Sequence, residues 1–396
     1  MTQAAYVSTY VPRRCGLATY TYHLRQHVKR AKLWSNPDPV IVLTDGGEHA
    51  DGRNPALWPL PKNEREAYAQ MARRLNDSSV TVVSLQHEFG IFGGEAGAYV
   101  LDFVRALQKP LVTTFHTVFA EPEEPYRSIQ QEIADRSDRI IVMNRKAIGF
   151  LHRAFGVPEE KIVFIPHGTP IPDPKQREAF RQQMDWQDRR VMMTFGLLGR
   201  GKGLEMILEA LPQVVEAVPN ILYAIVGQTH PEVKKREGEA YRRELQALIS
   251  RNRLENHVVM IDRYVEEDEL VKFLSACDLY VTPYPGMQQI TSGTLAYAVG
   301  LGRPVLSTPY CYAEDLLAGC EELLIPYGDT AQWAEKIAAL LQHDETRRGW
   351  EQKIGSIGAA MHWPLVGKRH AQLFAQLSSR MSAQAAGGTA VASRSR

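Results

Sequence analysis

The first half of the chain alternates short apolar runs with amphipathic stretches, the pattern expected of strands and helices in a mostly parallel sheet. Short apolar runs predict strands at 4–9, 40–44, 80–85, 111–115, 139–143 and 162–165. Apolar residues at a helical period predict helices at 19–31, 64–76, 96–106, 126–135 and 144–155. Polar residues or glycines follow each strand, and open α/β sheets bind ligands at that edge.

A proline-rich segment, PHGTPIPDP at 166–174, separates this half from a second series of the same kind. Its four prolines cannot continue a helix or a central strand, so it predicts a linker. The strands predicted after it are 191–195, 221–226, 258–261, 279–282, 304–307 and 323–325. The helices predicted between them are 204–217, 236–251, 267–276, 293–301, 313–318 and 330–341.

This organisation predicts an α/β protein with two Rossmann-like, doubly wound parallel-sheet domains that face each other across a cleft. We expect the first domain at 1–168, a linker at 169–190 and the second domain at 191–360. An amphipathic helix at 361–380 should return toward the first domain. The remaining residues, 381–396, contain little to bury, which predicts a disordered tail.

Two strand-to-helix turns in the second half carry the features of an anion site. The first turn, GLLGRGKG, contains Gly196, Gly199, Arg200, Lys202 and Gly203. The second lies in the stretch 287–308 and brings four residues to the start of a helix: Thr291, Ser292, Gly293 and Thr294. Free backbone N–H groups and the helix dipole favour an anion at such turns. Two helix starts and two cations suit a diphosphate, which indicates an enzyme of nucleotide sugars rather than a dehydrogenase or a kinase.

Each turn also has a plainer explanation. Glycines beside cations are common on solvated turns, and Ser and Thr favour the N-cap of any helix. A glycine among three hydroxyl residues instead favours a backbone that a ligand approaches closely. The presence of both turns in one domain favours ligand binding.

Composition describes an ordinary globular chain of 396 residues, 44% hydrophobic and 23% charged. The net charge of +1 gives no electrostatic reason to expect a nucleic-acid partner. The four cysteines show no C-x-x-C spacing, and the start of the chain shows no secretory signal, which together predict reduced thiols and a cytoplasmic location. No apolar run approaches the roughly 18 residues of a membrane span. The basic run 23–32 is interpreted as a solvated helix face, so we expect at most peripheral membrane contact.

Over most of its length the chain resembles the retaining glycosyltransferases of family 4, which belong to glycosyl transferase group 1 and have the GT-B fold. The matching pieces occur in the family's order and are Pro12–Gly16, Thr114–His116, Ile165–Gly168, Gly196 with Lys202–Gly203, and Gly302–Val305. The resemblance implies transfer of a hexose from a UDP- or GDP-linked sugar to an acceptor hydroxyl, with retention and with neither a metal nor another cofactor.

Three positions depart from the family's pattern. The family carries a Glu-x7-Glu pair at the positions of Gln289 and Tyr297, where the second glutamate contacts the ribose. The arginine that often follows the first glycine of the turn is replaced by Leu197. Tyr297 could contact the nucleotide or could be a core tyrosine, in which case Glu314 becomes the first candidate for the ribose.

Three candidates lie in the first half. His116 follows a predicted strand and matches the family histidine beside the donor sugar, although a lone histidine at a strand end is often structural. Gly16 matches the loop under the leaving phosphate, and Arg13 and Arg14 beside it are weak acceptor candidates or a basic surface loop. His87 and Glu88 start a loop of two aromatics and three glycines that suits a sugar face, or is simply a surface loop. They form only half of a zinc motif, so we expect no metal there.

Three functions remain open on these grounds. The first is the metal-independent glycosyltransferase, which uses a nucleotide sugar and an acceptor on a glycan, glycolipid or small molecule. The second is a GT-B phosphorylase or sugar-phosphate-using enzyme, which the loss of both glutamates permits. The third is a non-catalytic binding protein of the same fold, against which the retained His116, Lys202 and Gly203 argue.

Overall fold

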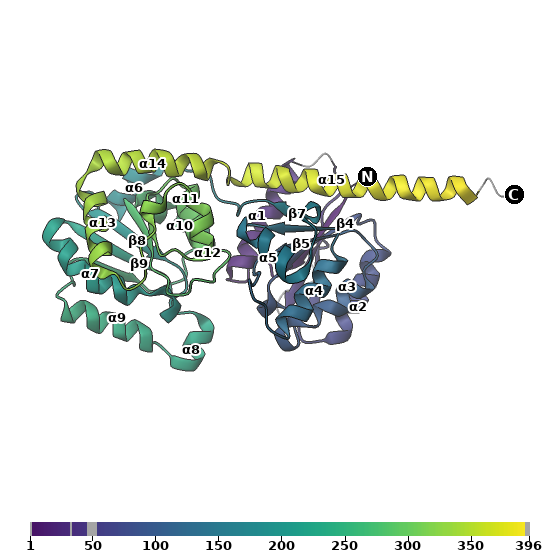
Figure 1. Ribbon diagram of the computed structural model, residues 1–396, viewed down its shortest axis with the longest axis horizontal. Helices are drawn as coiled ribbons and strands as arrows, with labels where there is room; N and C mark the ends of the chain where they lie inside the picture. Colours follow the sequence, from purple (N-terminus) through teal and green to yellow (C-terminus); the bar gives the residue numbers. More distant parts are fainter. Residues whose placement is uncertain (1, 32–33, 46–53, 393–396) are drawn as a thin grey trace. The chain divides into compact units, whose positions relative to one another are not determined.

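The chain forms two compact units, one made of Met1–Gly168 with Trp363–Arg396 and the other of Thr169–His362. The computed structural model describes residues 2–31, 34–45 and 54–392, with backbone alone for 380–392. Each unit contains one parallel sheet flanked by helices (Figure 1). The predicted α/β fold with two parallel-sheet domains is therefore confirmed.

The described part of the first unit contains a seven-stranded sheet in the order β3-β2-β1-β4-β5-β6-β7. Its strands are β1 (Ala4–Ser8), β2 (Val40–Thr44), β3 (Leu57–Pro61), β4 (Val82–His87), β5 (Leu111–Phe115), β6 (Arg139–Val142) and β7 (Ile162–Phe164). Its α-helices are α1 (Gly16–Ala31), α2 (Arg65–Asn76), α3 (Val100–Ala106), α4 (Tyr126–Arg136), α5 (Lys146–Phe155) and α15 (Trp363–Ala392). Its 3-10 helices are η1 (Phe89–Ile91), η2 (Glu95–Gly97) and η3 (Glu159–Lys161).

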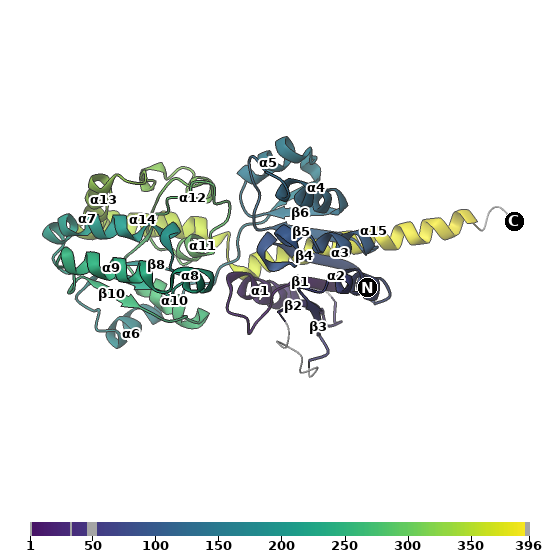
Figure 2. The same ribbon diagram turned by 90° about the horizontal axis from the view of Figure 1, so that it is seen from below.

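Helix α15 completes the first unit, although it lies at the far end of the sequence. It packs against α1 and β4, and Figure 2 shows it running along the sheet. Its Trp363, Val366 and Phe374 are buried in one cluster with Tyr6 of β1 and Leu24 of α1. Apolar residues from both ends of the chain therefore cover one face of this sheet.

The second unit contains a five-stranded parallel sheet in the order β10-β9-β8-β11-β12. Its strands are β8 (Arg190–Phe195), β9 (Ile221–Val226), β10 (Val258–Ile261), β11 (Leu279–Thr282) and β12 (Val305–Ser307). Its α-helices are α6 (Lys175–Gln183), α7 (Leu204–Ala217), α8 (Pro231–Glu237), α9 (Ala240–Arg251), α10 (Glu267–Ala276), α11 (Gly293–Gly300), α12 (Cys311–Leu316), α13 (Thr330–Gln342) and α14 (Asp344–Ala359). Its 3-10 helices are η4 (Arg200–Lys202) and η5 (Glu321–Leu323).

The linker predicted at 169–190 contains a helix, α6. This helix belongs to the second unit. Arg177 and Arg181 of α6 form salt bridges with Asp278, at 2.5 and 3.3 Å, and this carboxylate is 2% exposed. Phe180 of the same helix and the following Trp186 are buried. Long-range charge pairs and apolar burial thus hold the part of the predicted linker that follows the prolines against the second unit.

Four other elements differ from the sequence prediction. Strand β3 was missed because it contains two prolines, which an edge strand tolerates. The helix predicted at 236–251 is divided into α8 and α9 around Gly238, whose φ is +60°. Helix α14 was not predicted, and the strand predicted at 323–325 is replaced by η5 and one isolated bridge from Leu324 to Ser307.

In the segment predicted to be disordered from residue 381, α15 continues to Ala392, and the predicted disorder itself stays untested. Residues 393–396, like Lys32 of the basic run, lie outside the described residues. Among the described residues, no helix combines the length and apolar character needed to cross a membrane.

Three buried histidines predict that the first unit is sensitive to acid. Burial lowers the pKa of His87 and His116 to about 3 and that of His370 to about 4. The unfolded chain binds protons at these positions below about pH 6.5, where the folded chain does not, so stability is lost as the pH falls. We expect the first unit to lose up to about 1.4 kcal/mol per pH unit for each histidine between pH 6.5 and 5.

Calorimetric unfolding at several pH values measures this loss, and His87→Phe is the matched variant because His87 lies among aromatic rings. The variant should unfold with a shallower pH dependence than the wild type. An identical pH dependence in both proteins would show that His87 is not one of the acid-sensitive groups.

Candidate functional site

The turn between β8 and α7 requires glycine at two of its positions. Gly196 and Gly203 have φ values of +135° and +60°, which L side chains rarely adopt. A Cβ on Gly203 would overlap the carbonyl oxygen of Pro283, at the end of β11. A Cβ on Gly227, which follows β9, would likewise overlap the carbonyl oxygen of Gly196. The turn is therefore in backbone contact with the ends of both neighbouring strands.

Lys202 lies at the centre of this turn and faces Gly196. A Cβ built on Gly196 would be 3.6 Å from Lys202 Nζ and 3.5 Å from Thr294 Cγ2. The ammonium group donates a hydrogen bond of 3.0 Å to the Tyr284 hydroxyl and lies 4.3 Å from the centre of that ring. The two turns that the sequence predicts as anion sites are thus adjacent, and Lys202 of the first and Thr294 of the second both lie beside Gly196.

Helix α11 begins at Gly293, as the sequence predicts. Ser292 is its N-cap, and the Oγ atom accepts a hydrogen bond of 3.3 Å from the Leu295 N–H. The first N–H groups of a helix have no partner within the helix and carry partial positive charge. Thr294 lies in this first turn, and both it and the Lys202 ammonium lie beside Gly196. The ammonium and the start of α11 therefore create positive electrostatic potential in the same place.

Tyr284, which sequence reasoning missed, is also part of the site. Its hydroxyl lies 2.9 Å from Thr294 Oγ1, and its side chain is almost fully buried. Its ring stacks on Tyr310 with the centroids 5.4 Å apart. The available signal was its place directly after β11, at the ligand edge of the sheet, where a hydroxyl aromatic has a polar end as well as an apolar body.

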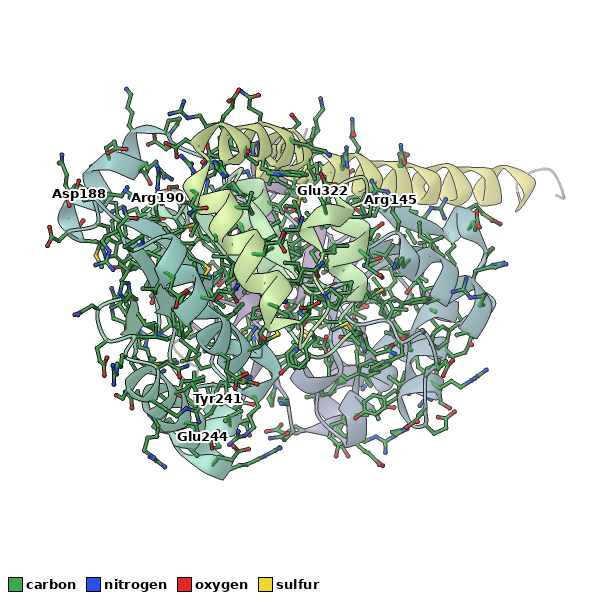
Figure 3. All side chains as sticks on the ribbon, turned by 60° about the vertical axis from the view of Figure 1, so that its left-hand side comes forward. Arg145, Asp188, Arg190, Tyr241, Glu244 and Glu322 are labelled. Atoms are coloured by element: carbon green, nitrogen blue, oxygen red, sulfur yellow. The ribbon has the colours of Figure 1, made fainter. Side chains whose placement is uncertain are left out.

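Arg200, predicted to share the diphosphate with Lys202, is instead held on the surface of the same unit. Its guanidinium makes hydrogen bonds of 2.7 and 2.6 Å to the two carboxylate oxygens of Glu244. It lies over the Tyr241 ring at 5.6 Å, and Figure 3 labels both partners on α9. In this structure a bidentate carboxylate holds the guanidinium, and a role for Arg200 at the diphosphate remains a prediction.

The two residues that replace the family's glutamates both form hydrogen bonds within the chain. Gln289 is exposed, and its amide donates a hydrogen bond of 2.8 Å to the carbonyl of Thr291 in its own loop. Tyr297 is buried in the core, and its hydroxyl donates a hydrogen bond of 2.6 Å to Glu267 of α10. The structure favours the core role for Tyr297 over the predicted ribose contact. Glu314, in the first turn of α12, remains the predicted alternative.

His116 lies in the first unit, directly after β5, as predicted. Its Nε2 atom is 3.0 Å from Gln86 Oε1, while the Gln86 amide nitrogen donates to Ser84 Oγ at 3.1 Å. This network makes Nε2 the protonated nitrogen and leaves Nδ1 as an acceptor. Burial lowers the pKa of His116 to about 3, so the ring is neutral and can orient a hydroxyl group without holding its proton.

His87 and Glu88 were predicted as weak acceptor ligands, and the structure contradicts this for His87. His87 is fully buried between Phe89, Phe92 and Phe115. Glu88 accepts a hydrogen bond from the Phe89 N–H with one oxygen and from Thr117 Oγ1, at 2.6 Å, with the other. These contacts stabilise the end of β4, so the local motif has a structural explanation.

The remaining candidates of the first unit lie around the start of α1. Gly16 is the first residue of the helix, and a Cβ there would meet no atom within 4 Å. Arg13 forms a salt bridge of 2.8 Å with Asp45, and Arg14 is exposed with interactions of its own. Cys15 Sγ lies 3.4 Å from the Ala18 N–H, which makes it a weak cap of α1. Roles for Gly16, Arg13 and Arg14 in ligand binding remain predictions.

Family models match both halves of the chain. Residues 15–171 match the model described as Glycosyltransferase Family 4, and residues 189–343 match that described as Glycosyl transferases group 1. The chain belongs to the group 1 glycosyltransferases. The two matches correspond closely to the two units of this glycosyltransferase, and the β8–α7 turn with Lys202 lies within the second match.

Solved structures support the same GT-B fold for this glycosyltransferase. Sucrose-phosphate synthase from Thermosynechococcus elongatus is 17% identical, with a TM-score of 0.76 over 96% of this chain and 100% of that chain. HepE from Anabaena, in complex with UDP and glucose, is 15% identical, with a TM-score of 0.74 over 95% and 100%. A glycosyltransferase from Rickettsia africae is 13% identical, with a TM-score of 0.73 over 95% and 98%. The chain matches no curated protein sequence.

Replacement of Gly203 should destabilise the second unit. Gly203→Ala requires a left-handed backbone that costs about 1–2 kcal/mol for an L residue, in addition to the overlap with Pro283. Gly201→Ala is the matched control, because a Cβ at Gly201 meets nothing within 4 Å. Urea unfolding should show a loss of about 2 kcal/mol or more for Gly203→Ala and under about 0.5 kcal/mol for Gly201→Ala. Equal losses would contradict the backbone contact.

Tyr297→Phe should lower stability and leave nucleotide affinity unchanged. The variant removes a hydroxyl that bonds Glu267, which costs about 1–2 kcal/mol when the acceptor is charged. Glu267→Gln keeps the shape and weakens the same bond, so its melting temperature should also fall. Calorimetric titration with UDP provides the affinity. Weaker UDP binding at an unchanged melting temperature would restore the ribose contact predicted from the sequence.

Proposed function

We propose that the chain is a retaining, metal-independent hexosyltransferase that takes a UDP- or GDP-linked sugar and transfers the hexose to an acceptor hydroxyl. The observation that carries the proposal is that the Lys202 ammonium and Thr294, at the start of α11, both lie beside Gly196. In the reaction the bond from sugar C1 to the diphosphate oxygen breaks and a bond from C1 to the acceptor oxygen forms. The hydroxyl proton leaves with the nucleoside diphosphate.

The second unit supplies what the departing diphosphate needs. Negative charge grows on the leaving oxygen as the C1–O bond breaks, and a prearranged cation stabilises that charge. Lys202 provides the cation, and the free N–H groups of the α11 start provide dipoles that need no reorganisation. HepE, a protein of similar fold, binds UDP and glucose, which supports a nucleotide-sugar donor for this chain.

The first unit supplies groups suited to the sugar and to the acceptor. His116 offers Nδ1 as a hydrogen-bond acceptor, and its edge contact with Tyr20, with centroids 5.0 Å apart, limits rotation of the ring. A neutral, fixed acceptor can orient a hydroxyl group. The acceptor is a hydroxyl on a glycan, a glycolipid or a small molecule.

The donor chemistry needs no metal on this proposal. Within the residues that the structure describes, no three His, Cys, Asp or Glu side chains are placed to bind a metal ion together. The positive charge at the proposed diphosphate site comes from Lys202 and from the backbone.

A donor panel tests the proposed activity. UDP, GDP and ADP sugars are incubated with the protein and a mixture of glycan, glycolipid and small-molecule acceptors, with EDTA present, and the released nucleoside diphosphate is measured. Release in EDTA, with an α-linked product from an α-linked donor, is the expected result. Sugar 1-phosphate formed with inorganic phosphate would instead indicate a phosphorylase, and binding without turnover would indicate a non-catalytic protein. Strict dependence on added Mg²⁺ or Mn²⁺ would contradict the metal-independent site.

Lys202→Ala should lower kcat/KM by about a hundredfold, since loss of one prearranged group on a developing anion costs about 3 kcal/mol. Its melting temperature should change little, because an alanine fits the turn. Arg200→Ala is the matched control from the same turn, and it should change kcat/KM by less than about threefold because Glu244 holds that guanidinium elsewhere. A larger loss in Arg200→Ala than in Lys202→Ala would reverse the assignment.

A further inference from the structure

Four side chains form a continuous hydrogen-bonded chain across the two turns of the second unit. Lys202 Nζ is 3.0 Å from Tyr284 Oη, and Tyr284 Oη is 2.9 Å from Thr294 Oγ1. Thr294 Oγ1 is 3.1 Å from Ser292 Oγ. The chain ends at the N-cap of α11, because Ser292 Oγ accepts from the Leu295 N–H.

The chemistry of the first group fixes the direction of the first bond. An ammonium group has three donors and no acceptor, so Tyr284 must accept from Lys202. Tyr284 Oη and Thr294 Oγ1 share the next hydrogen bond, in which either hydroxyl can be the donor. Tyr284 therefore presents a lone pair to the ammonium at all times, and this polarity does not depend on how any hydroxyl is rotated.

Both the ring and the backbone of Tyr284 are held in place. Its ring stacks on Tyr310 at an interplanar angle of 21°, and its carbonyl oxygen accepts a hydrogen bond of 2.6 Å from Thr308 Oγ1. The side chain is 1% exposed. A lysine has a flexible four-carbon stem that loses much rotamer freedom when it is fixed, and a hydrogen bond to a rigid acceptor offsets this cost.

We propose that Tyr284 is a positioning residue that holds the Lys202 ammonium beside Gly196 and the start of α11, where a diphosphate would bind. The inference rests on the proposed function. No second cation of the turn helps to hold the ammonium group, since Leu197 is apolar and Arg200 is bound to Glu244. The buried Tyr284 orders the Lys202 side chain instead. Tyr284 acts through Lys202 and does not itself need to touch the substrate.

A double-mutant cycle between Tyr284 and Lys202 tests the inference. Tyr284→Phe keeps the ring, its stacking on Tyr310 and the ring face toward the lysine, and removes the hydroxyl alone. We measure the Kd of inorganic pyrophosphate and kcat/KM for the donor in the wild type, Tyr284→Phe, Lys202→Ala and the double variant. Tyr223→Phe is the matched control, because it removes a buried hydroxyl of the same unit that lies 2.9 Å from Thr194 Oγ1.

In the Lys202 background, Tyr284→Phe should weaken pyrophosphate binding and lower kcat/KM by about tenfold, as expected for the loss of a hydrogen bond to a charged group. In the Lys202→Ala background the same substitution should change both by less than about twofold. Tyr223→Phe should change both by less than about twofold in either background, whatever it does to the melting temperature.

Equal losses from Tyr284→Phe in both backgrounds would overturn the positioning role, because a purely structural effect persists without the lysine. Unchanged pyrophosphate affinity in Tyr284→Phe would overturn it as well. No pyrophosphate binding by the wild type would remove the anion site and the inference with it. If pyrophosphate binds and the cycle shows coupling but no nucleotide sugar reacts, the positioning role stands and the proposed transfer reaction fails.

Discussion

The contact on which the second unit depends is a close approach of two backbones. Gly203 lies so near the carbonyl of Pro283 that a methyl group at this position would overlap the oxygen. This approach sets the β8–α7 turn against the segment that follows β11, and Lys202 and Tyr284 are the immediate neighbours of the two residues in contact. The ammonium–hydroxyl bond and its extension to the start of α11 follow from that approach, since a wider separation would leave the lysine without an acceptor.

The sequence was sufficient for the architecture because alternation of apolar runs and amphipathic stretches is a local property. It failed where distant residues decide the outcome. Helix α6 is fixed by a buried aspartate about a hundred residues away, and the prolines of β3 are tolerated only because that strand lies at an edge. Neither fact can be read from the segment itself.

The same distinction applies to the candidate site. Gly196, Gly203, Lys202 and the α11 start were found from the sequence because glycine and N-cap patterns are local signals. The partners of Arg200 and Tyr297 could not be predicted in the same way, because Glu244 lies on α9 and Glu267 lies on α10. Tyr284 was missed because an aromatic beside a strand normally indicates core, and only the adjacent lysine shows that its hydroxyl is in use.

The first unit is discontinuous in the sequence, and this affects how it can be made. Its sheet and α1 are synthesised early, but Trp363, Val366 and Phe374, which share their apolar cluster, leave the ribosome only after the whole second unit. Throughout that interval, the apolar face that α15 will cover stays open to solvent or to a chaperone. The second unit, which is continuous from Thr169 to His362, can close its core without waiting for the end of the chain. A translational pause or a truncation before Trp363 would therefore leave a second unit with a complete core attached to a first unit that lacks part of its own.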